Sequence, residues 1–420
     1  MKPSPSHEPP PRVVVVGSGF AGLAAMADLA KLGWQAWLVD RQSYTTFQPL
    51  LFQVATGGIN VEDVAFPIRS LLRRMGQGRF VQGAALAIEW DFRRVILESG
   101  RALAYDYLLL ATGAVPKFFG VPGAAEWGLS LHTLADAARL RTRLVDVLER
   151  AAADFGRHQV HVVVVGGGPT GVETAGALAE LRDLLAGRDY PELRREDINI
   201  ELLEAAPRLL PGFHPKLSRY AQRALEGRSV AVMTGCAVRE VREDAVLIDS
   251  GLRPADLLVW SAGVEVADSP LSLGLARTPS GRLAVSPSLQ LRDHPEAFAL
   301  GDVAGAQAAA SELPQLAQPA IQAGRHAVRQ LQRMRSGEDA QAFFYRDRGM
   351  MATIGRRAAV AQLPGGLRLT GTAAWLAWLG LHLAELLGVR NRASVLLNWT
   401  WHYLAWRHAA GLIPPAPDRG

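Results

Sequence analysis

Cysteine is almost missing from this chain of 420 residues, which contains only Cys236. One thiol cannot form an internal disulfide, a cysteine-rich metal site or a dithiol redox pair. Lysine is scarce too, and arginine supplies most of the 45 basic residues behind the net charge of +5. A basic excess this small suits anionic lipid or nucleotide phosphates, and we expect no nucleic-acid partner.

Long apolar runs are absent as well. No stretch reaches the roughly 18 uninterrupted apolar residues of a membrane-spanning helix, so we expect no such helix. Residues 1–11 are rich in proline and serine and lack the apolar stretch of a secretory signal, which predicts a disordered tail. His158 and His161 would point to opposite sides of a strand, and we expect no metal site. The remaining composition is that of a globular protein of two or three domains.

A dinucleotide-binding fingerprint is present near the N-terminus. Four consecutive valines predict a strand buried in a parallel sheet, and they lead directly into Gly17-x-Gly19-x-x-Gly22 and a predicted helix. Gly17 would form the tight turn, Gly19 would admit a pyrophosphate, and Gly22 would let the helix pack on the strand. A second predicted strand ends at Asp40, whose carboxylate would accept hydrogen bonds from ribose hydroxyls.

The same pattern recurs in the middle of the chain. Four more valines lead into Gly166, Gly168 and Gly171, and a later strand ends at Glu204 after a charged insertion in the crossover. Two fingerprints imply two dinucleotides, and the natural pair is a flavin and a nicotinamide. The acid Glu204 favours NADH over NADPH, although Arg208 follows only four residues later and weakens this preference.

Three further predicted strands end in small or acidic residues. These ends lie at Thr112 and Gly113, at Gly263 and at Asp302. Each alone would be no more than a strand terminus. Together with the two fingerprints they give the order GxGxxG, ATG, GxGxxG, AG and GD along the chain.

In this order the motifs resemble those of the two-dinucleotide-binding-domain flavoproteins. Within them the chain resembles a type II NADH:quinone oxidoreductase, from about Arg12 to Ile413. Four segments carry the narrower resemblance: residues 40–56, the run from Gly168 to Glu173, residues 317–324, and residues 350–356 with the tryptophan-rich segment after them. Residues 317–324 match the AQxAxQxG quinone motif of that family and are the most specific segment, although Pro319 stands inside it.

The resemblance implies an α/β fold with two Rossmann-like dinucleotide-binding domains and a C-terminal amphipathic helical segment that anchors to a membrane. It places an FAD domain at residues 12–121 and 286–335 and an NADH domain at residues 122–285. The C-terminal membrane-association segment would cover residues 336–420.

The resemblance also implies FAD and NADH as cofactors, and hydride transfer from NADH to FAD. Two-electron reduction of a membrane quinone would follow, without proton pumping. The expected FAD contacts are Gly17, Gly19, Ala21, Asp40, Arg41, Thr112 and Asp302, and the expected NADH contacts are Gly168, Gly171, Glu204 and Gly263. The cofactor-binding set is completed by Gly22, Gly113, Gly166, Ala317 and Gln318.

Three residues are the predicted catalytic groups. By position alone, Glu173 could equally be a first-turn glutamate favoured by the helix dipole, but the resemblance places it near the contact between nicotinamide and flavin. There it would stabilise the stack or relay a proton to quinone. Gln318 and Gln322 share a helix face and would hydrogen-bond a quinone carbonyl or the flavin edge, although a solvated polar stripe is the default for such a pair. The small residues of their motif would let a flat ring approach.

The C-terminal segment from Gly371 to Ile413 is rich in tryptophan and leucine at helical spacing. Its tryptophans are Trp375, Trp378, Trp399, Trp401 and Trp406. Such stripes usually form a core or a dimer interface, whereas tryptophan with flanking arginine also suits helices lying in a bilayer surface. We expect a peripheral protein at the cytoplasmic face of the inner (plasma) membrane and, from the resemblance, a homodimer.

Other redox functions are less consistent with the sequence. A sulfide:quinone reductase or a disulfide reductase needs paired cysteines, which Cys236 cannot provide. A reductase of a small iron–sulfur protein leaves the glutamine motif and the tryptophan-rich segment unexplained. A non-enzymatic flavin-bound redox sensor or interaction protein is the alternative from another class. The identity of the quinone stays open.

Overall fold

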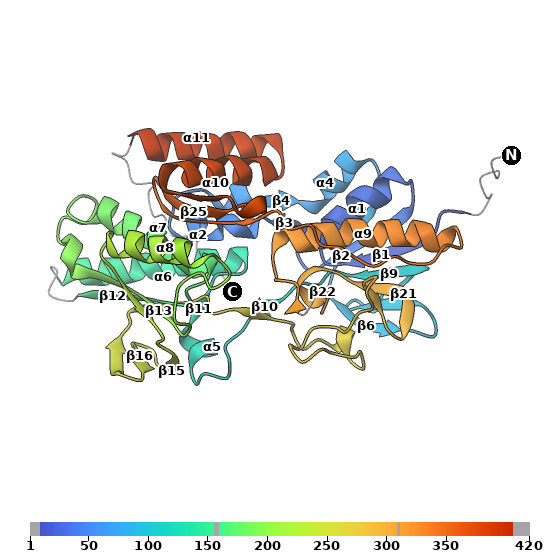
Figure 1. Ribbon diagram of the computed structural model, residues 1–420, viewed down its shortest axis with the longest axis horizontal. Helices are drawn as coiled ribbons and strands as arrows, with labels where there is room; N and C mark the ends of the chain where they lie inside the picture. The colour runs from blue at the N-terminus through green and yellow to red at the C-terminus, as the bar shows by residue number, and fades with distance from the viewer. Residues whose placement is uncertain (1–8, 155–158, 309–310, 406–420) are drawn as a thin grey trace. The chain divides into compact units, whose positions relative to one another are not determined.

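The computed structural model describes residues 9–154, 159–308 and 311–405 of a chain that divides into two compact units (Figure 1). The first unit contains the residues up to Thr45, Phe66–Val115 and Glu265–Asp347, and the second contains Thr46–Ala65, Pro116–Val264 and the residues from Arg348. Each unit is built around its own parallel sheet.

The sheet of the first unit has six strands, and the consecutive valines of the first fingerprint lie at its centre. Its order is β20 (Gln290–Leu291), β21 (His294–Ala299), β9 (Tyr107–Leu110), β1 (Arg12–Val16), β2 (Gln35–Asp40) and β5 (Arg79–Gln82), and all but β20 run parallel. Val13 and Val15 belong to the core on one face and Val14 and Val16 to the core on the other. Burial on both faces explains the unbroken run of valines.

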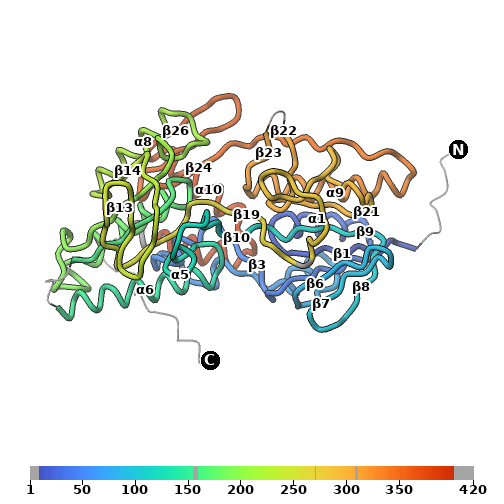
Figure 2. The backbone as a smooth tube through the Cα atoms, turned by 90° about the horizontal axis from the view of Figure 1, so that it is seen from below, coloured from blue at the N-terminus to red at the C-terminus, as the bar shows by residue number. Residues whose placement is uncertain are grey.

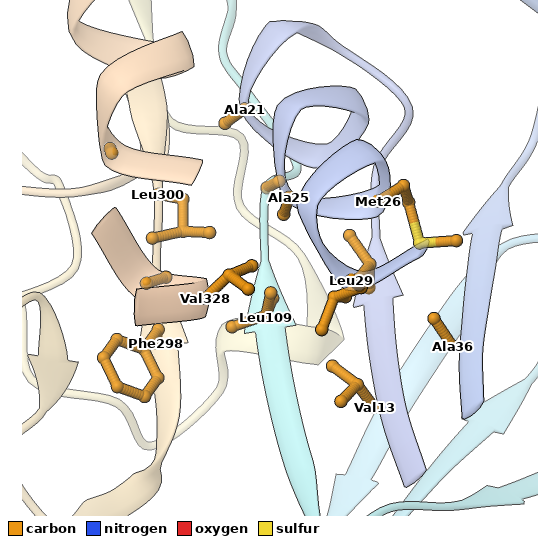
Figure 3. Packing of buried hydrophobic residues seen from close by; sticks show 14 of the residues in the cluster. Val13, Ala21, Ala25, Met26, Leu29, Ala36, Leu109, Phe298, Leu300 and Val328 are labelled. Atoms are coloured by element: carbon orange, nitrogen blue, oxygen red, sulfur yellow. The ribbon is translucent and has the colours of Figure 1, made fainter. Parts of the chain in front are cut away.

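Two helices cover one face of this sheet, and a small antiparallel sheet shares the core of the other face. The helices are α1 (Phe20–Lys31) and α9 (Ala317–Arg335), and Figure 3 shows Leu29 of α1 close to Val13 and Met26 close to Ala36. The small sheet consists of β6 (Ala85–Glu89), β7 (Arg94–Leu97) and β8 (Ala102–Ala104), which lie next to each other in Figure 2.

Residues 317–324 form the start of α9, and their small side chains pack against α1. A Cβ atom added at Gly324 would lie 2.2 Å from the carbonyl oxygen of Ala21, so the two helix backbones are in close contact there. Ala320 lies in the same core cluster as Ala21 and Ala25. The expectation that these small residues make room for a flat ring is therefore wrong for Ala320 and Gly324, because another helix occupies that space.

The second unit repeats the layered arrangement of the first. Its parallel sheet has the order β11 (Leu129–Ser130), β18 (Leu257–Trp260), β12 (Val160–Val165), β13 (Ile198–Glu204) and β14 (Val230–Thr234). The helices α6 (Leu134–Ala153), α7 (Pro169–Leu185) and α8 (Pro215–Glu226) pack on this sheet (Figure 1). A three-stranded antiparallel sheet packs on it as well, formed by β15 (Val238–Val241), β16 (Ala245–Ile248) and β17 (Gly251–Pro254). The predicted α/β fold with two dinucleotide-binding units is confirmed.

The C-terminal segment begins with a third antiparallel sheet and ends with two helices. The sheet consists of β24 (Met350–Gly355), β25 (Ala358–Gln362) and β26 (Arg368–Thr370), and the helices are α10 (Gly371–Glu385) and α11 (Val389–Ala405). A Cβ atom at Gly176 of α7 would lie 2.3 Å from the carbonyl oxygen of Ile354, so α7 and β24 are in close contact. Among the described helices, none combines the length and the apolar character needed to cross a bilayer. Trp406 lies outside the described residues.

The compact units divide the chain differently from the predicted division by cofactor. Residues Thr46–Ala65 fall in the second unit, because α2 (Leu51–Ala55) packs against α6 and α7, and α3 (Val61–Val64) packs against α11. The C-terminal segment joins the second unit as well, through α7 and β24. The assignment of each stretch of chain to FAD, to NADH or to a membrane stays a prediction.

We predict that Gly324→Ala lowers the free energy of unfolding by about 1–3 kcal/mol, because the new methyl group would force α1 and α9 apart. Gly380→Ala is the matched control, since Gly380 lies inside α10 and its Cβ would meet nothing within 4 Å. That control should leave stability unchanged or raise it by up to about 1 kcal/mol. Urea unfolding followed by circular dichroism measures both, and equal effects at the two glycines would contradict the close packing.

Candidate active site

The first fingerprint folds into a turn that has no room for side chains. Gly17 has a φ of +104°, and its Cβ would lie 2.2 Å from the carbonyl oxygen of Ala111. A Cβ at Gly22 would lie 1.9 Å from the carbonyl oxygen of Gly17, while Gly19, the N-cap of α1, has nothing within 4 Å of its Cβ position. The open side at Gly19 is where a helix N-terminus can receive a pyrophosphate. Contact of these glycines with FAD stays a prediction.

The second fingerprint repeats this geometry in the second unit. Gly166 has a φ of +107°, and a Cβ at Gly171 would lie 1.8 Å from its carbonyl oxygen. Gly168 is the N-cap of α7, and the space at its Cβ position is open. Gly263, with a φ of +142°, accepts a hydrogen bond at its carbonyl oxygen from the backbone N–H of Lys117 at 3.0 Å.

Asp40 fixes the first glycine turn through its carboxylate. Its Oδ2 accepts hydrogen bonds from the backbone N–H and from the hydroxyl of Ser18, both at 2.7 Å. Its Oδ1 accepts from the backbone N–H of Gln42 at 2.9 Å. A carboxylate has about four acceptor positions, so Asp40 still has capacity for a ribose hydroxyl.

Glu204 makes the corresponding bonds in the second fingerprint. Its Oε2 accepts from the backbone N–H of Gly167 in the glycine turn, and its Oε1 accepts from that of Ala206 at 2.6 Å. The guanidinium of Arg208 is held elsewhere, since it donates to the carbonyl oxygens of Phe213 and Pro211, each at 2.6 Å. Because this guanidinium already binds carbonyl oxygens, it gives little support to binding of a 2′-phosphate. The position of Arg208 therefore does not weaken the preference for NADH over NADPH that Glu204 indicates.

A cavity of about 210 Å³ in the first unit brings five of the predicted cofactor-binding residues together. They are Gly17, Asp40, Arg41, Thr112 and Gly113. These residues fit a dinucleotide, because the cavity combines a glycine turn with an acid at the end of the adjacent parallel strand.

The other predicted residues of the first unit lie outside the lining of this cavity. Asp302 is half-buried after β21, and its burial raises its pKa to about 6, while the next residue, Val303, lines the cavity. Ala21 is buried between α1 and α9, and Ala317 and Gln318 are half-buried at the start of α9. Their contacts with FAD stay predictions.

Gln322 has a structural partner. Its Nε2 donates to the carbonyl oxygen of Arg346 at 2.9 Å, and its Oε1 accepts from the backbone N–H of Arg346 at 3.0 Å. This two-point pairing ties α9 to the segment that precedes β24. The predicted hydrogen bond from Gln322 to quinone would have to compete with it, and it stays a prediction.

Glu173 is buried in the second unit, with 8% of its surface exposed. Its Oε1 accepts hydrogen bonds from the backbone N–H of Thr353 at 3.2 Å and from Nε1 of Trp378 at 3.1 Å. Burial raises its pKa to about 8, because a carboxylate loses its hydration there, and the two hydrogen bonds oppose the rise. A surface glutamate favoured only by the helix dipole does not describe this residue. Near neutral pH it is a buried acid that holds a proton.

Aromatic side chains of α10 and α11 surround this acid. Trp378 stacks on His382 at 4.0 Å between ring centroids and lies 5.9 Å from the ring of Trp399. Nε1 of Trp399 donates to Oε1 of the buried Gln53 at 2.8 Å. Burial lowers the pKa of His382 to about 4, so its ring is neutral near pH 7 and adds no charge beside Glu173.

The partners of Glu173 were not identified from the sequence. Thr353 and Trp378 lie 180 and 205 positions away from it. Residues 350–356 and the tryptophan-rich segment stood out as motifs, but nothing in their local pattern shows that they meet α7. Only the tertiary structure connects them.

The chain is similar to known proteins over most of its length. Residues 11–324 match the family described as pyridine nucleotide-disulphide oxidoreductase, and residues 348–408 match the NDH2 C-terminal domain. The chain is 37% identical over 411 residues to the type II NADH:quinone oxidoreductase NdhA of Mycobacterium tuberculosis, covering 92% of this chain and 86% of that protein. It is 34% identical over 431 residues to the type II NADH:quinone oxidoreductase Ndh of the same organism, covering 96% and 92%.

The solved structure of NDH2 from Plasmodium falciparum in complex with NADH has the same fold. It superposes with a TM-score of 0.87 at 19% sequence identity and covers 96% of this chain and 99% of that chain. At this identity the likeness concerns the fold.

We predict that Glu173 makes the stability of the protein fall as the pH rises. The folded chain keeps the proton of Glu173 up to about pH 8, whereas the unfolded chain loses it near pH 4.5. Relative to Glu173→Gln, the wild type should therefore lose about 1 kcal/mol of unfolding free energy per pH unit between these values. Denaturant unfolding at several pH values measures this difference, and parallel profiles for the two proteins would contradict it.

Proposed function

Because the chain belongs to the type II NADH:quinone oxidoreductase family, we propose that it oxidises NADH and reduces a quinone held in a membrane. The observation that carries the proposal is the buried acid Glu173, which lies in α7 two residues after Gly171 of the second dinucleotide fingerprint. Family membership supports this function over an iron–sulfur protein reductase and over a non-enzymatic redox sensor.

Each of the two fingerprints would bind one of the two cofactors. FAD supplies the redox chemistry when bound, taking a hydride from NADH and passing two electrons to quinone. The cavity with Gly17, Asp40 and Thr112 would hold FAD, and the turn pinned by Glu204 would hold NADH. The acid at Glu204 and the occupied guanidinium of Arg208 support NADH over NADPH.

Glu173 acts as the proton donor in this proposal. Reduction of a quinone to a quinol needs two electrons and two protons, whereas a hydride brings two electrons and one proton. The second proton has to come from water, and a buried acid with a pKa near neutrality suits this transfer. When Glu173 gives up its proton, the N–H groups of Thr353 and Trp378 stabilise the carboxylate that remains.

The C-terminal helices would contact a lipid surface. Among the described side chains of these helices, the large exposed apolar ones are Leu376 and Leu381 on α10 and Val389, Leu396, Leu397 and Trp401 on α11. The exposed Arg390 adds a positive charge near the start of α11, where it can meet anionic lipid. Contact of α10 and α11 with the lipid surface would bring the protein next to a quinone held in the membrane. We propose peripheral attachment at the cytoplasmic face, and a homodimer remains the competing use of the same surface.

We predict that Glu173→Gln lowers turnover with a soluble quinone by roughly 10²-fold, because an amide cannot donate this proton. The amide oxygen can still accept from Thr353 and Trp378, so the fold and the FAD content should be unchanged. NADH oxidation with ferricyanide, which takes up electrons without protons, is the control reaction and should keep its rate. Wild-type turnover with quinone would overturn the role of Glu173.

We predict that replacing Leu396, Leu397 and Trp401 together by serine weakens cosedimentation with anionic lipid vesicles at least several-fold. Leu252→Ser is the matched control, because Leu252 is an exposed leucine of β17. Point substitutions are preferable to deleting the residues after Gly371, since deletion would remove Trp378 from Glu173. If the triple variant loses a dimer in light scattering and keeps its vesicle binding, the surface is a subunit interface instead.

A further inference from the structure

Two cavities of the second unit meet at one side chain, Glu180 of α7. The inner cavity has a volume of about 40 Å³, and Glu173, Ala177 and Glu180 are among its lining residues. The outer cavity has a volume of about 450 Å³. It is lined by Glu180, Asp183, Gly227, Arg228, Arg356 and Arg357. Since Gly227 and Arg357 are exposed, the outer cavity lies at the protein surface.

The two glutamates lie on one face of α7. Positions 173, 177 and 180 are separated by four and three residues, which places their side chains in one row along a helix. Ala177 stands between the acids, and its short side chain leaves space along that row. The inner cavity exceeds the roughly 10–15 Å³ that one water molecule needs, so water fits in the space that Glu173 and Glu180 both line.

The position of the Glu180 carboxyl group is well defined. Its Oε1 accepts a hydrogen bond from the backbone N–H of Arg356. A Cβ at Gly355 would lie 2.5 Å from this oxygen and 3.0 Å from Nε of Arg228, so only glycine leaves room for both groups. Burial raises the pKa of Glu180, Asp183 raises it further, and the hydrogen bond and charge of Arg356 and the charge of Arg228 oppose the rise.

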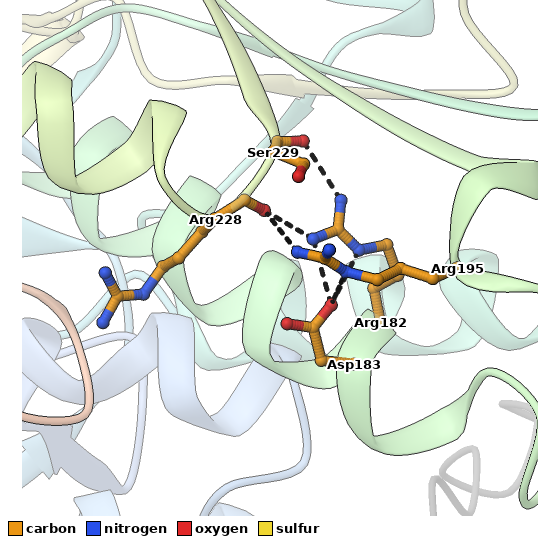
Figure 4. Close-up of polar contacts among 5 residues, drawn as sticks. All are labelled: Arg182, Asp183, Arg195, Arg228 and Ser229. Atoms are coloured by element: carbon orange, nitrogen blue, oxygen red, sulfur yellow. Dashed lines mark hydrogen bonds and ion pairs between the residues drawn. The ribbon is translucent and has the colours of Figure 1, made fainter.

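A network of arginines holds the wall of the outer cavity in place (Figure 4). The buried guanidinium of Arg182 donates to the carbonyl oxygens of Arg228 at 2.5 Å and of Ser229 at 3.1 Å. Asp183 accepts hydrogen bonds from Arg182 at 3.0 Å and from Arg195 at 2.7 Å. These contacts fix the loop after α8, from which Arg228 reaches the cavity. The charged insertion after the second fingerprint thus has a structural role beside Glu180.

We propose that Glu180 is a relay residue that carries protons from the outer cavity to Glu173. An O–H bond of Glu180 breaks and an O–H bond forms on Glu173, with the proton carried by water in the inner cavity, and water in the outer cavity then returns a proton to Glu180. No electrons move in this step, and the net charge of the pair is restored. The proposal rests on the proposed function, because Glu173 needs a new proton only if it gives one to quinone in each turnover.

The groups around Glu180 suit this role. The charged side chains facing it come from three elements: Asp183 from α7, Arg228 from the loop after α8, and Arg356 and Arg357 from the loop after β24. Arg228 and Arg356 stabilise Glu180 while it is ionised, and burial favours its protonated form. A group balanced between the two forms can exchange protons in both directions.

The test uses Glu180→Gln in the FAD-loaded full chain. We expect turnover with a soluble quinone to fall about tenfold, because the amide cannot pass on a proton. The solvent deuterium isotope effect on that turnover should increase, while the rate with ferricyanide stays at the wild-type value. Glu180→Asp should recover part of the lost rate, and added acetate should recover part of it in Glu180→Gln. Glu226→Gln, an exposed glutamate of α8, should match the wild type in every assay.

The outcomes separate the relay from the role of Glu173. If Glu180→Gln turns over quinone at the wild-type rate while Glu173→Gln is slow, the relay is overturned and the proposed function stands. If both variants match the wild type, both proposals fall. If Glu180→Gln also slows the ferricyanide reaction, or if Glu180→Asp is no faster than Glu180→Gln, its role is structural and the relay is overturned.

Discussion

The hydrogen bonds of the buried carboxyl of Glu173 connect three elements of the second unit around the candidate site. One oxygen accepts from the backbone of Thr353 and from the indole of Trp378, which joins α7 to β24 and α10. These elements belong to a nucleotide-binding fold and to a C-terminal segment that a sequence pattern treats as separate. Because an unpaired carboxyl in an apolar interior is costly, the aromatic helix, the small sheet and α7 have to assemble together.

The second constraint is that the acid at the end of the neighbouring strand accepts a hydrogen bond from each glycine turn and so fixes its conformation. Asp40 accepts a hydrogen bond from the backbone N–H of Ser18, and Glu204 accepts one from the backbone N–H of Gly167, so the two units use the same contact at corresponding positions. The carboxylate thereby contributes to the fold before any nucleotide binds. The acid that we propose for ribose recognition also shapes the glycine turn, which explains why the acid and the glycines occur together in the sequence pattern.

Sequence reasoning succeeded where neighbouring residues determine the structure. The valine runs, the three glycines of each turn and the acids Asp40 and Glu204 all follow from spacing along the chain, and the α/β fold follows from them. The use of Ala320 and Gly324 in helix packing was missed, because a row of small residues fits a helix as well as it fits a flat ring. The surroundings of Glu173 were missed for another reason. They depend on contacts between distant segments, which periodicity does not encode.

A buried acid needs both isolation and a supply of protons, and these requirements conflict. Isolation raises the pKa of Glu173 towards neutrality, yet it also removes the water that would restore its proton. A second carboxyl about two helical turns away resolves the conflict, because Glu180 lines both the inner cavity and the outer cavity. Glu173 can then stay buried and still regain its proton, because the periodicity of α7 places the two acids in one row.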